Sequence, residues 1–62
     1  MEKNKSTIKI EIALEYYNKQ GKEILALVNT SNSLTADQII HYGEEMSIIE
    51  YKITALKVAL EN

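Results

Sequence analysis

The chain has 62 residues, no cysteine and a single histidine, and its formal net charge at pH 7 is -2. Without cysteine it forms no disulfide and no thiolate metal site, and one histidine rules out a histidine-rich metal site. The acidic balance counts against a nucleic-acid partner, because such proteins usually carry a basic face. A chain of this length forms at most one domain, and its small core predicts either tight internal packing or a partner subunit.

The sequence has no apolar run long enough for a signal peptide or a membrane-spanning helix, so we expect no membrane association. The lack of cysteine fits a cytoplasmic protein. Nothing resembles a phosphate-binding loop, a nucleophile with its base or a dinucleotide fingerprint, and no cofactor of its own is expected.

The first helix is predicted over residues 7–28. Its opening letters, TIKIEI, alternate apolar and polar as a strand does, but a helical pattern covers more positions. That pattern steps by four and three residues along Ile10, Leu14, Tyr17, Gly21, Ile24 and Val28. Gly21 stands in its middle, where glycine costs about 1 kcal/mol relative to alanine. This glycine predicts either a break in the helix or room for a side chain of the opposite helix, Met46.

A polar turn is predicted at 29–34, where the letters NTSNS favour a loop, and a second helix at 36–60. Thr35 and Gln38 have the spacing of a capping box, which would start this helix. One apolar stripe then steps by three and four residues, as in a heptad pattern, and should form the core or dimer seam. Its members are Ile39, Tyr42, Met46, Ile49, Ile53, Leu56 and Leu60.

These elements predict an all-α fold, a single antiparallel two-helix hairpin over residues 1–62. Folding at the polar turn sets the stripes face to face, with Gly21 opposite Met46 and Leu14 opposite Ile53. Both helices also carry a second apolar flank, which a lone hairpin does not need. We expect this flank to be covered by a second copy, giving a homodimeric four-helix bundle, or by a different protein.

The letters YGEEMS at 42–47 place a glycine and two adjacent carboxylates in the middle of the second helix. Glu44 and Glu45 point to different sides, since successive helical residues are about 100° apart. A solvated face is one explanation, because charged residues are usually exposed, and a functional site is the other. A glycosidase-type carboxylate pair does not fit, because so small a chain offers no substrate cleft. No further ligands accompany His41, so no metal site is predicted.

The segment LTADQIIHYGEEMSIIEYKI, after a helix and a short loop, resembles the stage-zero-E-type aspartyl-phosphate phosphatases, small sporulation regulators of spore-forming bacteria. The signature of that family, Ser-Gln-Glu-Leu-Asp, lies on the second helix of a helical hairpin. In an ungapped alignment Glu45 matches the glutamate by identity. The other four signature positions, in order, are taken by Gly43, Glu44, Met46 and Ser47.

The resemblance implies a protein that docks on a phosphorylated response regulator, hastens loss of its aspartyl phosphate and so negatively regulates sporulation. The regulator would supply an acidic pocket with Mg²⁺, and the small partner an orienting or basic side chain. It implies catalytic roles for Glu44, Glu45 and Ser47 and binding roles for Gly43 and His41. Glu44 departs from the signature because it replaces the neutral glutamine with a negative charge. Ser47 departs from it because serine, unlike aspartate, is no general base at neutral pH.

Two other functions stay open. A relative without turnover would bind a response regulator and titrate it, since the aspartate of the signature is replaced. An unrelated dimeric hairpin would serve as an adaptor. An RNA-binding adaptor is disfavoured by the acidic balance, because phosphate contacts need clustered Lys and Arg.

Overall fold

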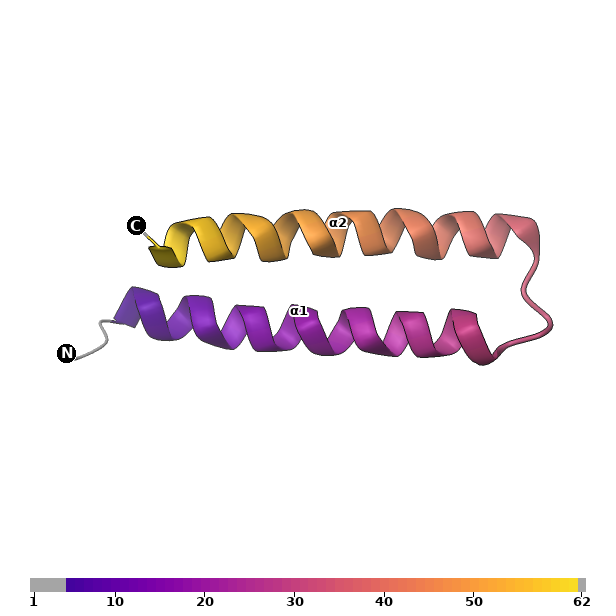
Figure 1. The fold of residues 1–62 in the computed structure, drawn as a ribbon, viewed down its shortest axis with the longest axis horizontal. Helices are drawn as coiled ribbons and strands as arrows, with labels where there is room; N and C mark the ends of the chain where they lie inside the picture. The colour runs from indigo at the N-terminus through magenta and orange to yellow at the C-terminus, as the bar shows by residue number, and fades with distance from the viewer. Residues whose placement is uncertain (1–4, 62) are drawn as a thin grey trace.

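The computed structural model describes residues 5–61, which form two long helices joined by a short loop (Figure 1). α1 spans Lys5–Thr30 and α2 spans Ala36–Glu61. The helices run antiparallel, so the start of α1 lies at the same end of the molecule as the end of α2. The predicted ranges 7–28 and 36–60 lie inside these helices. The described part of the chain contains no strand, and the predicted all-α hairpin is confirmed.

The start of α2 is closed by the predicted capping box. The Thr35 amide donates to Gln38 Oε1 over 2.8 Å, and the Gln38 amide donates to Thr35 Oγ1 over 3.1 Å. The Ile39 amide donates to the Thr35 carbonyl over 3.0 Å, which is the first backbone bond of the helix. These bonds satisfy amides that a helix start otherwise leaves without partners.

The loop is shorter than the polar turn predicted at 29–34, because α1 extends into it. The Thr30 hydroxyl donates to the Ala26 carbonyl over 2.6 Å, and the Ser31 amide donates to the Leu27 carbonyl over 3.1 Å. The Leu27 carbonyl is one of the last four of α1, which lack partners within the helix, and the Thr30 hydroxyl bond holds that side chain against the last turn. The polar residues at the start of the predicted turn thus complete the helix instead of leaving it.

α1 is continuous through both places where the sequence allowed an alternative. The TIKIEI segment is helical and forms no strand. Gly21 is buried in mid-helix without a break. A Cβ built on Gly21 would lie 3.7 Å from Met46 Cε and 3.7 Å from Ile49 Cγ2. Gly21 thus packs against Met46 and Ile49, as the predicted register requires, but these are ordinary contact distances, so a methyl group would also fit and the glycine is not needed to make room for Met46.

The seam between the helices follows the two predicted stripes. All members of the α1 stripe are buried or half-buried. On α2, Met46, Ile53 and Leu56 are half-buried, and Ile49, at 6% exposure, is the only buried hydrophobic residue of the described chain. Ile39 and Leu60, also predicted in this stripe, are 50% and 39% exposed, because they lie in the first and last turns of α2. The core is thus a thin strip rather than a closed interior.

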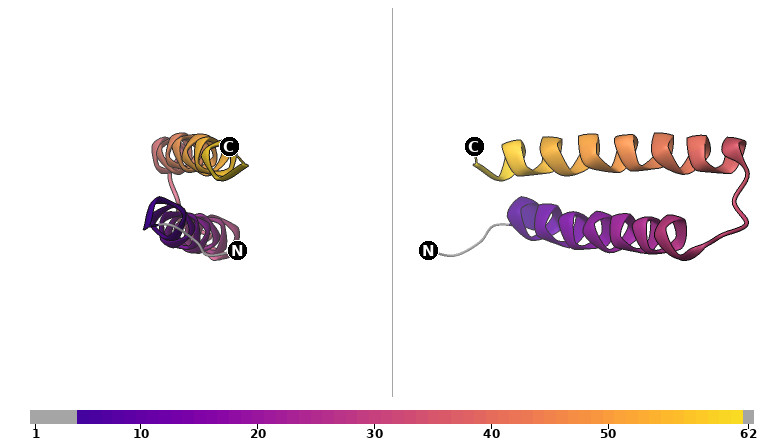
Figure 2. Two further views of the ribbon diagram at one scale, coloured as in Figure 1. Left: turned by 90° about the vertical axis from the view of Figure 1, so that its left-hand side faces the viewer. Right: turned by 45° about the vertical axis from the view of Figure 1, so that its right-hand side comes forward.

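The hairpin is a single layer of two helices, as the end-on view shows (Figure 2). Its extents are 49 × 16 × 12 Å, and its radius of gyration is 14.7 Å. A compact domain of this length would have a radius of gyration of about 10.5 Å. The second apolar flank therefore has nothing to pack against within residues 5–61. Its exposed members include Ile12, Tyr16, Ile40, Ile48 and Tyr51.

Candidate functional site

Three of the predicted site residues share one exposed face of α2. Glu44 and Ser47 are three residues apart, and Gly43 and Ser47 are four apart, which are the spacings of neighbours on a helix surface. All three are exposed. A Cβ built on Gly43 would meet nothing within 4 Å, so the backbone there is open to an approaching molecule. We refer to Gly43, Glu44 and Ser47 as the polar island.

The polar island faces away from α1. Ile49 marks the side of α2 that packs on α1, because it is only 6% exposed. At about 100° per residue, Glu44 lies about 140° and Ser47 about 160° around the helix from Ile49. Neither side chain takes part in the seam. A partner can therefore reach both without disturbing the hairpin.

Glu45 is separated from the polar island and pairs with His41. Glu45 Oε1 lies 3.2 Å from His41 Nε2, and the two side chains are 44% and 66% exposed. Glu45 also lines a groove between the helices, together with Gln20, Ile24 and Lys52 among others. The structure thus brings the predicted site residues together as two sets, the polar island and the His41–Glu45 pair. The prediction that all of them serve one reaction stays a prediction.

Exposed apolar side chains border the polar island along α2. Ile40 lies four residues before Glu44, and Ile48 lies four residues after it. Tyr51 lies four residues after Ser47, so all three are surface neighbours of the island. Their exposed fractions are 59%, 54% and 75% for Ile40, Ile48 and Tyr51. Exposed apolar groups gathered in this way form a candidate contact surface for another molecule.

One contact beside this region was not among the predictions. Lys52 Nζ lies 5.0 Å from the centroid of the Tyr17 ring, which is a cation–π geometry. The register that sets Gly21 against Met46 and Ile49 also brings Tyr17 level with Lys52. The spacing of the two stripes was therefore the signal that would have found this contact.

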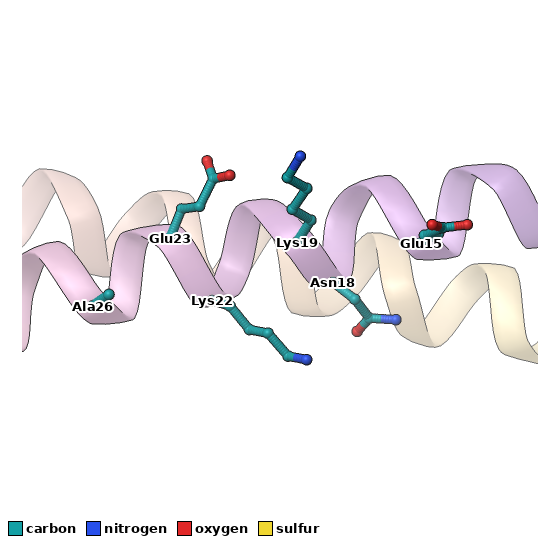
Figure 3. A pocket seen from close by; sticks show the side chains of 6 residues that line it. All are labelled: Glu15, Asn18, Lys19, Lys22, Glu23 and Ala26. Carbon is teal, nitrogen blue, oxygen red and sulfur yellow. The ribbon is translucent and has the colours of Figure 1, made fainter.

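A shallow hollow on α1 is lined by charged side chains of both signs and lies apart from the polar island (Figure 3). The Lys19 and Glu23 side chains project to one side of it and Lys22 to the other. Mixed charges on an exposed helix face are the pattern of a solvated surface. Among residues 5–61 no three His, Asp or Glu side chains are grouped closely enough to hold a metal ion.

The polar island offers a carboxylate and a hydroxyl on a rigid helix. It sits on a convex surface, where no cleft can enclose a small substrate and exclude water. Glu44 can accept a proton or a hydrogen bond, and Ser47 can donate or accept one. These groups suit the orientation of a water molecule at a reactive centre that another macromolecule brings.

Comparisons of the chain with protein-family models, curated proteins and solved structures found no match. The resemblance to the sporulation phosphatases therefore stays a prediction. Neither of the two described helices is long and apolar enough to cross a membrane.

Proposed function

We propose that the chain hydrolyses the aspartyl phosphate of a response regulator and thereby restrains sporulation. The observation that carries the proposal is the polar island. Glu44 and Ser47 occupy the positions of the glutamine and the aspartate in the family signature, and both lie on the exposed face of α2. A partner protein that brings the phosphorylated aspartate would meet these two groups first.

The reaction is the hydrolysis of an acyl phosphate. A bond forms between a water oxygen and phosphorus, while the bond between phosphorus and the aspartate oxygen breaks. The products are inorganic phosphate and a free carboxylate on the regulator. The carboxylates of the regulator's acidic pocket would hold Mg²⁺, and this cation would balance the negative charge of the phosphoryl oxygens. What remains for the small protein is to hold the water in line with phosphorus.

Glu44 is the group proposed to hold that water, as its proton and hydrogen-bond acceptor. Ser47, one turn further along α2, adds a hydrogen bond to the water or to a phosphoryl oxygen. Because both side chains stand on one regular helix, their spacing is set before the partner arrives. The negative charge of Glu44 opposes its approach to an anionic centre, and an amide at this position would hold water without that repulsion.

Gly43 and Ile40 are proposed to form the docking contact around these groups. The open backbone at Gly43 lets the partner's main chain come close, as glycine does where a side chain would obstruct. Ile40, 59% exposed, provides apolar area beside it. The His41–Glu45 pair lies on the adjacent side of α2, where it borders the docking contact and does not reach the phosphoryl group directly.

The assembly proposed for the hairpin is a homodimeric four-helix bundle. Its support is the second apolar flank, which stays exposed in the single chain on both helices. A four-helix bundle would bury much of this flank against a second copy and leave Ile40 free for the docking contact. The cytoplasm, where response regulators act, is the compartment that this proposal requires.

The experiment is a dephosphorylation assay against a panel of phosphorylated response regulators from a spore-forming host. Glu44→Ala should slow phosphate loss from the cognate regulator by tenfold or more, on the order of 1.4 kcal/mol in the barrier. Its melting temperature should stay near that of the wild type, because exposed polar positions usually change stability by less than about 0.5 kcal/mol. Glu23→Ala is the matched control, since Glu23 is an exposed glutamate on α1.

The other two functions give different outcomes in the same assay. If the wild type binds a phosphorylated regulator without speeding hydrolysis, and Glu44→Gln with Ser47→Asp does speed it, the chain is a titrating relative. If neither protein binds any regulator, the hairpin is an adaptor of another kind, and Glu44 belongs to a solvated face.

A further inference from the structure

A groove between the helices runs along each long edge of the hairpin. On one edge a continuous groove is formed mainly by apolar side chains, and Lys52 is shared by its two halves. Its chief apolar members are Ala13, Tyr17, Ile24, Ile48, Tyr51 and Ala55. The groove on the opposite edge is also largely apolar, with Tyr17, Leu25 and Ile53 among its members, and it is bordered by Asn18, Lys22 and Glu50. We refer to the first groove as the apolar edge.

The chain exposes more surface than a folded monomer of its mass. Its total accessible area is 5208 Å², whereas a monomeric protein of 7.1 kDa exposes about 4,100 Å². The surplus is about 1,100 Å², and a stable protein–protein interface removes about 800 Å² from each partner. This surplus belongs to the whole hairpin and is large enough to include one subunit's share of a stable interface, for which the apolar edge has a suitable composition.

We propose that the apolar edge binds a second copy of this chain, with the two α2 helices antiparallel about Ile48. In a two-fold interface the same patch serves both subunits, so Ile48 meets the partner's Ile48. Glu45 precedes Ile48 by three residues and Lys52 follows it by four. The two-fold axis therefore sets Glu45 opposite the partner's Lys52, and Lys52 opposite the partner's Glu45. These charges are complementary in this register and repel each other in a parallel arrangement.

The α1 helices fit the same rotation axis. Gln20 lies in the groove at the level of Ile48, so it falls near the axis and can hydrogen-bond to the partner's Gln20. Tyr17 and Ile24 lie three residues before and four residues after it, which sets Tyr17 opposite the partner's Ile24. Small side chains at Ala13 and Ala55 let the helices approach closely. The pairing is thus self-complementary on both helices.

The polar island stays accessible in this arrangement. At about 100° per residue, Ser47 lies about 100° and Gly43 about 140° around α2 from Ile48. Glu44, about 40° from Ile48, lies at the margin of the interface. Each dimer therefore presents two islands on its outer surface. The interface itself does not depend on the proposed phosphatase activity.

Sedimentation equilibrium on the full chain tests the interface, with circular dichroism to follow helicity. The wild type should sediment at about twice 7.1 kDa at micromolar concentration. Ile48→Glu should give a helical monomer, because Ile48 is already 54% exposed in the single chain. Glu45→Lys and Lys52→Glu should each raise the dissociation constant of the dimer about tenfold, since the two-fold symmetry gives each dimer two contacts between like charges.

The charge-swapped double variant, Glu45→Lys with Lys52→Glu, should restore the dissociation constant to within about threefold of the wild type. The control is Glu50→Lys, which makes the same charge change on the opposite edge and should leave the dimer intact. A wild-type monomer throughout the micromolar range overturns the proposal. It is also overturned if Ile48→Glu stays dimeric, if the double variant is no tighter than either single variant, or if Glu50→Lys weakens the dimer equally.

Discussion

Replacing each of the two helix glycines by alanine distinguishes an effect on packing from an effect on docking of the partner protein, because the two glycines differ in what surrounds them. Alanine in place of glycine in a helix interior raises the free energy of unfolding by about 1 kcal/mol. At Gly43 the added methyl group meets nothing within 4 Å, so the full gain should appear. At Gly21 it would lie 3.7 Å from Met46 Cε and from Ile49 Cγ2, which is ordinary contact distance, so this gain should also be kept.

Both variants should therefore melt higher than the wild type, by about 4–8 °C for a chain of this size. The melts are compared at one protein concentration, since dimerisation makes the melting temperature depend on it. Their effects on function should differ. Gly43→Ala should slow dephosphorylation of the regulator, because its methyl group stands where the partner's backbone approaches, and Gly21→Ala should leave the rate unchanged.

Two results would refute this reasoning. A lower melting temperature for Gly43→Ala would mean that position 43 is packed and not open. Equal dephosphorylation rates for Gly43→Ala and the wild type would mean that no backbone comes close to Gly43, and the docking contact would then have to lie elsewhere on α2.

The other predictions concern the seam, the cap and the division of the site. Ile49→Ala should cost about 2–5 kcal/mol in the free energy of unfolding, and half-buried Ile53→Ala less; thermal melts that show neither loss would contradict the register. Thr35→Ala should cost about 1 kcal/mol, because it removes a capping oxygen, and chemical denaturation of the two proteins measures this. Glu45→Ala should slow dephosphorylation less than Glu44→Ala does, and a larger loss would place Glu45 at the phosphoryl group.

The hairpin could be predicted because each of its main contacts has a periodic signal in the sequence. The stripes of α1 and α2 repeat every three or four residues, so folding at the polar turn already sets Gly21 against Met46. The capping box at Thr35 and Gln38 is a local pattern that needs no tertiary contact. The end of α1 was missed because the Thr30 side chain can bond either back into the helix or forward into a turn, and its residue type favours the turn.

The candidate site was only partly predictable. The separation of Glu44 from Glu45 follows from helix geometry, and so does the one-turn spacing of Glu45 and His41. The lining of the groove on each edge is harder to recognise, since it depends on which flank of α1 meets which flank of α2. The chemistry is hardest, because the group on which the polar island is proposed to act lies on another protein.

The most direct test of the central claim is the half-life of the aspartyl phosphate on a response regulator, measured with a sub-stoichiometric amount of this protein. The account predicts a shorter half-life for one regulator of the panel, with more inorganic phosphate released than protein molecules added. It also predicts that Glu44→Ala lengthens this half-life again by tenfold or more, on the order of 1.4 kcal/mol in the barrier. A half-life unchanged by the wild type for every regulator of the host would contradict the account.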